Sequence, residues 1–226
     1  IYAILLRLSN AKLDQIDQAL SKISLESENA KSADRDSLNK NARILKGDQI
    51  VQILAAGFFA GSDCASMLNE DFLGGENNAN PVPGDEIVQD SFSTIWQVQN
   101  AGLDGFHLKG IPFHGTQENS ACYLSFYLNS PRQLDNLLIE PNVPKLYLNV
   151  ETGCCVRVWL NRKEIFTQGK ISAKPVNSQI PLLLGKGNNQ ILLKVVNTDT
   201  DDVVKVFLSS SHTDFIEKLV GTVERN

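Results

Sequence analysis

The sequence predicts a mainly β protein, an antiparallel β-sandwich or jelly roll that follows an N-terminal α-helical hairpin. Three observations carry this prediction. Apolar and polar side chains alternate in short runs between Leu146 and Leu208, and Gly, Asn and Asp separate those runs. From about Ile87 onward turn signals are frequent, and no sustained helical period appears before the last dozen residues. Before that point, apolar residues recur at helical spacing.

The composition fits a soluble globular chain. Its 226 residues are 42% hydrophobic and 21% charged, enough to bury a core in one or two domains. The formal net charge is −5, and the lysines and arginines are scattered, which argues against nucleic acid as a partner. The opening run IYAILLRL is too short to span a bilayer, so no membrane span is expected within this chain. Because the chain begins at Ile1, we expect a processed product or an excised piece.

Residues 1–73 are predicted to be helical. Five apolar residues follow a spacing of seven, three, four and three, which places them on one stripe of a first helix. A polar connector follows, and a second set of apolar residues then predicts the second helix of the hairpin. The first set is Leu6, Leu13, Ile16, Leu20 and Ile23, and the second is Leu38, Leu45, Ile50, Ile53, Leu54 and Phe58.

Residues 74–90 contain GGENNANPVPGDE, whose glycine, asparagine and proline predict a linker. The β-sandwich is expected over 91–211, and residues 212–226 are expected to form a tail with helical character. The predicted strands cover 94–99, 121–129, 145–151, 154–160, 163–168, 179–184, 190–197 and 203–209. Only Asn161 and Arg162 separate two of these strands, which predicts a tight two-residue turn.

The four cysteines show no CxxC pair and no haem attachment site. Strand parity groups Cys154 with Val156 and Val158, and Cys122 with Leu124. If both groups face one core, a disulfide between Cys122 and Cys154 is geometrically allowed and would indicate an oxidising compartment. The alternative is that both are free thiols buried as small hydrophobes.

Several segments resemble the galactose-binding-domain-like β-sandwiches of secreted glycoside hydrolases and other large extracellular bacterial proteins. The resemblance rests on VWLN at 158–161, LLLGKGNNQILLKV at 182–195 and VKVFL at 204–208. It departs at Arg162, where that family usually has glycine. It implies a structural motif in which Asn188 or Asn189 hydrogen-bonds the turn. Members include sugar binders, spacers and docking domains, so the fold leaves the function open.

Catalytic and metal-binding signatures are missing from the sequence. His107, His114 and His212 have no metal-ligand spacing, and no nucleophile elbow, phosphate loop or HExxH motif occurs. No convincing carboxylate pair for glycoside hydrolysis emerges either. No cofactor is therefore expected, apart from a weak candidate for structural calcium. That candidate is the acidic loop of Asp199, Asp201 and Asp202.

Parity also predicts which residues face away from the core. The outward set forms the predicted ligand or partner face and comprises Trp159, Arg157, Tyr147, Tyr123 and Tyr127. An outward Trp159 could stack on sugar rings, or the helical hairpin or a partner subunit could cover it. A third interpretation inverts the parity and puts Trp159 in the core, where Trp96 is expected as well.

The function predicted from these observations is a non-catalytic interaction or assembly module of a larger secreted or periplasmic protein. Its partners would be another protein or other domains of the parent chain. The alternative is a carbohydrate-binding module that uses the outward aromatic residues. A third hypothesis is an enzyme whose site is built from loops.

Overall fold

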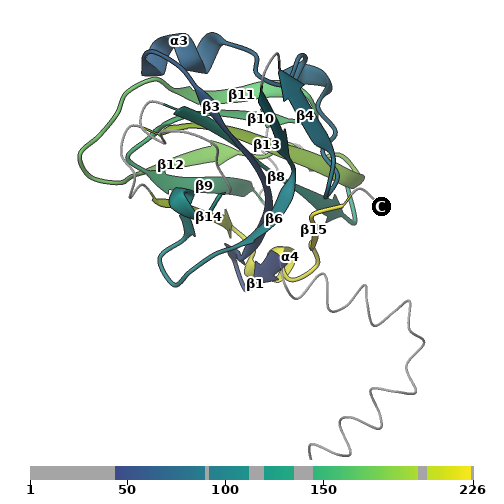
Figure 1. The fold of residues 1–226 in the computed structure, drawn as a ribbon. Helices are drawn as coiled ribbons and strands as arrows, with labels where there is room; N and C mark the ends of the chain where they lie inside the picture. The colour runs from purple at the N-terminus through teal and green to yellow at the C-terminus, as the bar shows by residue number, and fades with distance from the viewer. Residues whose placement is uncertain (1–43, 90–91, 112–119, 135–144, 198–202, 225–226) are drawn as a thin grey trace, which may run out of the picture. The chain divides into compact units, whose positions relative to one another are not determined.

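The computed structural model describes residues 44–89, 92–111, 120–134, 145–197 and 203–224, and Figure 1 shows their arrangement. All of them belong to the unit formed by residues 41–226. The first predicted helix and the start of the second lie outside the described residues, as do Asp199, Asp201, Asp202 and His114. None of the described helices is long and apolar enough to cross a membrane.

The described chain is mainly β, as predicted, and its strand pairs are antiparallel. A six-stranded sheet has the order β1-β2-β14-β9-β12, with β7 also paired to β14. Its strands are β1 (Leu45–Lys46), β2 (Gln49–Ile50), β7 (Phe106–His107), β9 (Leu146–Thr152), β12 (Val176–Pro181) and β14 (Val203–Ser210).

A seven-stranded sheet has the order β11-β10-β13-β8-β3-β6, with β15 paired to β8. Its strands are β3 (Gln52–Ala60), β6 (Gln97–Asn100), β8 (Ser120–Ser130), β10 (Cys155–Leu160), β11 (Lys163–Gln168), β13 (Gly187–Asn197) and β15 (Val220–Thr222). A separate hairpin pairs β4 (Glu86–Gln89) with β5 (Phe92–Ile95). The helical pieces are α3 (Cys64–Asn69), η1 (Glu76–Asn78), η2 (Leu108–Gly110) and α4 (Thr213–Ile216).

The two large sheets share one hydrophobic core, which is the arrangement of a β-sandwich. Register rows such as Val158, Leu193 and Leu124 carry the inward side chains of the seven-stranded sheet. The six-stranded sheet contributes the alternating residues of β9 and β14, such as Val150 and Val206, to the same core. The finer expectation of a jelly-roll topology stays a prediction.

The predicted second helix is wrong where the structure describes it. Residues 52–60 form strand β3, which pairs with β6 and β8 inside the seven-stranded sheet. The sequence QILAAGFFA is buried along nearly its whole length, so it lacks the polar alternation of a one-sided strand. Gly57 meets a tight neighbour there, because a Cβ added to it would lie 2.8 Å from Cys122 Cβ.

Residues on both sides of the predicted linker belong to the same unit. Glu76, near the start of that stretch, is 9% exposed, and β4 lies at its end. At the other end of the chain, the expected helical tail consists of the short α4 followed by strand β15.

Candidate binding site

Part of the predicted face lies on one side of the seven-stranded sheet. Arg157 pairs with Lys194, which pairs with Tyr123, and so the three side chains lie on one side of the sheet. Trp159 follows on the next row, opposite Leu192. The parity predicted for these residues is therefore confirmed.

This face is not open to solvent, however. Trp159 is 3% exposed, Tyr123 0% and Tyr127 2%. Residues 62–81, which we call the cover segment, contain α3 and η1 and contact β8, β10 and β13 from outside. The outward aromatic residues thus do not form an exposed stacking platform. In Figure 1, α3 lies at the top, above β3 and β11 of this sheet.

A disulfide fastens the start of the cover segment to the sheet. Cys64, the first residue of α3, is bonded to Cys155 on β10, with a Cα–Cα distance of 6.5 Å. Cys122 and Cys154 are buried in the core as parity predicts, but they are thiols outside the disulfide. The Cys122–Cys154 disulfide is therefore wrong, and the buried-thiol alternative is confirmed. Burial, and then the neighbouring Cys154, raise the pKa of the Cys122 thiol well above its usual range.

A hydrogen bond to the sheet forms a second attachment of the cover segment, at the end of α3. Asn69 Oδ1 accepts a hydrogen bond of 2.8 Å from the Arg157 guanidinium, which also lies 5.9 Å from the centroid of the Trp159 ring. Glu164 approaches Arg157 Nε at 3.7 Å. Arg157 therefore links the cover segment, Trp159 and the neighbouring strand β11, rather than facing a partner.

The middle of the cover segment is held by a buried ion pair. Lys194 Nζ lies 2.8 Å from Glu76 Oε1, and the hydroxyl of Tyr123 donates to the same oxygen at 2.5 Å. Lys194 also donates to the carbonyl oxygens of Leu68 and Glu70. Burial lowers the pKa of Lys194 and, assisted by the Glu76 carboxylate, raises that of Tyr123. Sequence patterns do not reveal this network, because each partner reads as an isolated polar residue.

A polar hollow of about 220 Å³ opens where the cover segment ends. Four separate parts of the chain contribute to it: the end of the cover segment, β8, the turn between β10 and β11, and the start of β13. Its lining residues all carry hydrogen-bonding side chains and include Tyr127 of the predicted face. They are Asn80, Tyr127, Asn161, Arg162, Asn188 and Gln190.

Hydrogen bonds fix several of these side chains. Gln190 is 9% exposed, and its Nε2 donates to the Ala79 carbonyl at 2.9 Å. The Tyr127 hydroxyl lies 3.2 Å from Asn80 Oδ1 and 3.3 Å from the Pro81 carbonyl oxygen, so its proton can be donated to either. The hollow is thus preorganised by the contacts that seat the cover segment.

The two-residue turn is confirmed, and it forms one wall of the hollow. Asn161 and Arg162 have φ of 49° and 72°, the left-handed pair of a type I′ hairpin turn. Asn161 Oδ1 accepts from the backbone N–H of Gln190 at 2.9 Å, and its Nδ2 donates to Asn189 Oδ1 at 2.8 Å. Asn189 is the residue that bonds the turn before β13, since its side chain also bonds Gly185.

Tyr147 lies elsewhere than predicted. It belongs to β9 of the six-stranded sheet, whereas Trp159 belongs to β10 of the other sheet, so the two are not neighbours on one face. Tyr147 is half-buried on the outer side, opposite Ser209 and Pro181. Phe207, also half-buried, lies on the same outer side, with Lys205 Nζ 5.6 Å from its ring centroid.

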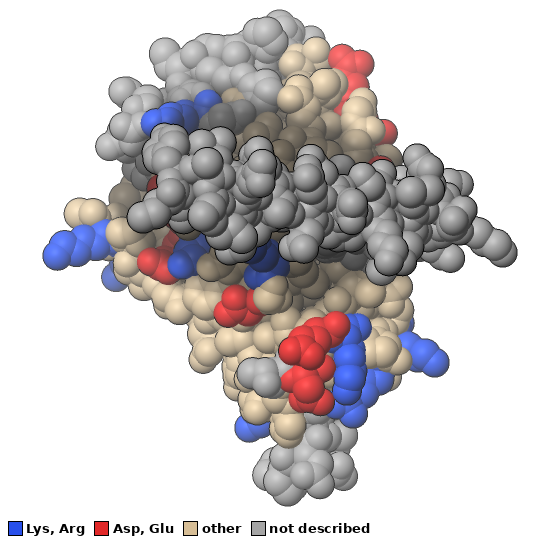
Figure 2. Space-filling view, turned by 90° about the horizontal axis from the view of Figure 1, so that it is seen from below, with Lys and Arg blue, Asp and Glu red and all other residues tan. Residues whose placement is uncertain are grey.

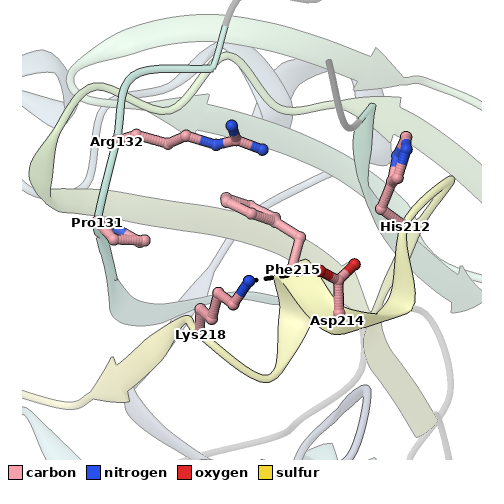
Figure 3. A pocket seen from close by; sticks show the side chains of 6 residues that line it. All are labelled: Pro131, Arg132, His212, Asp214, Phe215 and Lys218. Carbon is pink, nitrogen blue, oxygen red and sulfur yellow. Dashed lines mark hydrogen bonds and ion pairs between the residues drawn. The ribbon is translucent and has the colours of Figure 1, made fainter. Parts of the chain in front are cut away.

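A larger hollow of about 510 Å³ adjoins α4 (Figure 3). The Arg132 guanidinium lies 5.3 Å from the centroid of the Phe215 ring, and Lys218 Nζ is 3.3 Å from Asp214 Oδ2. Both cations thus already have partners within the hollow. His212 and Pro131 complete its lining.

Charged groups elsewhere in the described ranges do not assemble a metal centre. No group of three or more His, Cys, Asp or Glu side chains is placed there to hold a metal ion. His107 Nε2 lies 2.8 Å from Asp104 Oδ1, and this hydrogen bond lowers the pKa of Asp104. On the face shown in Figure 2, acidic and basic side chains lie beside one another instead of gathering by sign.

Trp96, which was expected in the core, is 4% exposed, and this confirms that prediction.

Comparisons with known proteins name no family. No family model matches the sequence, and no curated protein matches it. The resemblance to galactose-binding-domain-like sandwiches accordingly remains a resemblance.

Solved structures give distant matches. An anti-sigma factor domain-containing protein is 15% identical, with a TM-score of 0.40, over 75% of this chain and 45% of its own. A β-glucosidase from Kluyveromyces marxianus in complex with glucose is 12% identical, with a TM-score of 0.38, over 73% and 16%. The PA14 domain of the antifreeze protein MpAFP is 9% identical, with a TM-score of 0.42, over 75% and 89%. The chain thus spans less than half of the first two proteins, and at these TM-scores we draw no functional argument from the matches.

Proposed function

We propose that the sandwich is a non-catalytic module of a larger exported protein and that it binds a glycan, one unit of which enters the polar hollow. One observation carries this proposal. Six hydrogen-bonding side chains from four separate parts of the chain converge on a single hollow of about 220 Å³. Hollows for drug-sized ligands measure roughly 300 to 1,000 Å³, so this one suits a single small polar unit such as one sugar ring.

The chemistry of the lining favours a hydroxyl-rich ligand. An amide side chain has both a donor and an acceptor end, a tyrosine hydroxyl can play either part, and a guanidinium is a multiple donor. Sugar hydroxyls need this mixture of donors and acceptors. An aromatic or aliphatic anchor side chain of a protein partner would instead need a pocket lined by apolar groups.

Two further observations support the remaining parts of the proposal. Among the described residues that line the hollow there is no carboxylate, whereas glycoside hydrolysis requires a positioned pair of them. The Cys64–Cys155 disulfide fits an oxidising compartment such as the periplasm or the extracellular space.

The test is a glycan array followed by titration calorimetry with the best ligand. Asn80 is exposed and ends the cover segment, so Asn80→Ala removes a lining amide without opening the core. We expect this variant to weaken binding at least tenfold. Asn177→Ala, exposed on β12 of the other sheet, is the matched control and should bind as the wild type does. Failure of every glycan on the array to bind would refute the proposal, as would equal affinity of the two variants.

Protein assembly remains a second candidate function, and one observation favours it. On the β4–β5 hairpin, Val88 is 67% exposed and Ile95 43% exposed, and the register places them diagonally on the same face. Exposed apolar side chains that gather on one face are typical of contact surfaces. Under this function, Val88→Asp combined with Ile95→Asp should abolish concentration-dependent association in light scattering. Unchanged association would remove this candidate.

A further inference from the structure

We infer that the polar hollow selects a sugar unit that carries a carboxylate, and that Arg162 binds this carboxylate. The inference rests on the proposed function and narrows its ligand from glycans in general to acidic glycans built with uronic acids. It follows from the charges at the hollow, from the unengaged guanidinium of Arg162, and from the backbone conformation that Arg162 adopts.

The charge at the hollow is opposite in sign to that of the chain. Arg162 carries a positive charge, and the other described lining residues have amide or phenol side chains. The whole chain, in contrast, has a formal net charge of −5. Lys163 and Lys186, both exposed, adjoin the turn and the start of β13. A locally cationic hollow on an acidic protein attracts anionic ligands and disfavours binding to other parts of the surface.

The carboxylate closest to Arg162 in the sequence, that of Glu164, is engaged elsewhere. Glu164 lies beside Arg157 and accepts a hydrogen bond of 2.7 Å from the Thr167 hydroxyl. Among the described residues, neither a hydrogen-bond acceptor nor an acidic side chain engages the Arg162 guanidinium. Its planar fork is therefore available for a two-point contact with a ligand carboxylate.

The backbone conformation of the turn also indicates a role for the arginine side chain. A φ of 72° is a left-handed conformation that glycine adopts freely and that a residue with a Cβ adopts at a cost in free energy. The turn is nevertheless tied firmly to β13, because the backbone N–H of Asn161 donates to the Gln190 carbonyl at 2.9 Å. Arginine thus occupies a position whose backbone conformation glycine would adopt without strain. The reason for an arginine at this position therefore lies in its side chain.

The same strain provides a sharp test. Arg162→Gly removes the guanidinium and relieves the backbone, so the variant should melt at the same or a higher temperature than the wild type. Binding is measured by calorimetry with paired oligosaccharides that differ only in a terminal neutral sugar or its uronic acid, such as galactose and galacturonate.

We expect the wild type to prefer the acidic member at least tenfold and Arg162→Gly to lose that preference while it still binds the neutral one. Lys163→Ala, the control for general loss of positive charge, should keep most of the preference. Equal affinity of the wild type for both members would overturn the inference and leave the proposed function standing. A preference that persists in Arg162→Gly would overturn the role of Arg162, and absence of binding to either member, together with a negative glycan array, would overturn both proposals.

Discussion

Lys194 Nζ lies 2.8 Å from Glu76 Oε1, and their side chains are 0% and 10% exposed. The pair joins β13 of the seven-stranded sheet to the middle of the cover segment. The ammonium group also lies 4.8 Å from the centroid of the Phe72 ring, within range of a cation–π contact. Charge, rather than aliphatic packing alone, therefore holds the cover segment on this face.

Breaking one side of this pair should destabilise the fold strongly. Either Lys194→Met or Glu76→Leu leaves the other charge buried, and loss of one partner of a buried pair costs about 3–5 kcal/mol. The double variant should lose less than the sum of the single losses, because no charge is stranded. Guanidinium denaturation of all three measures this.

The exposed pair of Lys218 and Asp214 is the control for the ion-pair variants. Their side chains are 63% and 69% exposed, so Lys218→Met should change the free energy of unfolding by only a few tenths of a kcal/mol. Additive losses in the double variant of Lys194 and Glu76 would contradict the predicted coupling.

Alkaline pH should destabilise the protein through Tyr123. Its pKa is raised far above 10.0 by burial and by the Glu76 carboxylate, so above pH 10 the unfolded chain loses a proton that the folded chain keeps. Stability should therefore fall by up to about 1.4 kcal/mol per pH unit above that value. Lys194 acts in the opposite sense. Burial lowers its pKa, so between this lowered pKa and pH 10.5 the unfolded chain holds a proton that the folded chain has lost, and stability rises with pH. Above pH 10.5 Lys194 causes no further change.

Denaturation series between pH 9 and 11.5 check this prediction. Tyr123→Phe should flatten the loss of stability with pH, since no phenol titrates there. Tyr147→Phe, at a half-buried position of the other sheet, should leave the slope unchanged. The same slope in the wild type and in Tyr123→Phe would show that this group is not the cause.

Reduction should weaken the protein through the Cys64–Cys155 disulfide. This bond closes a loop with a sequence separation of 91, for which losses of about 2–5 kcal/mol are typical. Denaturation with and without reductant measures the loss, and Cys122→Ala should keep the same sensitivity to reductant. Peptide mapping under non-reducing conditions should link the Cys64 and Cys155 peptides. A Cys122–Cys154 link in that map would overturn the assignment.

Asn189 should be more important for stability than its polar character suggests. It is 1% exposed, and its side-chain amide accepts from the backbone N–H of Gly185 at 2.7 Å and donates to the carbonyls of Gly185 and Gly187 at 2.8 Å. Asn189→Ala removes the partner of these part-buried backbone groups, which costs about 1–3 kcal/mol. Thermal melting should show the loss, whereas Asn177→Ala should melt as the wild type does.

Strands with one exposed side could be predicted from the sequence. The run VVKVFL in β14 alternates between half-buried and buried positions, and the predicted and observed bounds of the strand agree within one residue. The turn at Asn161 and Arg162 followed from the same pattern, because two residues between alternating strands leave few conformations. Parity also placed Trp159 on the correct side of its sheet.

Contacts between distant segments could not be predicted in this way. Strand β3 is buried on both sides, so its pattern does not differ from that of a buried helix. The cover segment contains only a few apolar side chains, such as Met67, Leu68 and Phe72, among turn residues. Its attachment depends on partners far away in the sequence, from 47 positions between Glu76 and Tyr123 to 118 positions between Glu76 and Lys194. The members of the polar hollow likewise read singly as solvated turn residues.

The covered sheet has a consequence for the exchange of amide hydrogens. Strands β8 and β13 are shielded on both sides, by the core on one and by the cover segment on the other, and both are buried along almost their whole length. Their backbone N–H groups should therefore exchange with solvent deuterium only when the whole sandwich opens, while those of the edge strand β12 exchange through local fraying. The slowest amides of the chain would then mark the strands beneath residues 62–81.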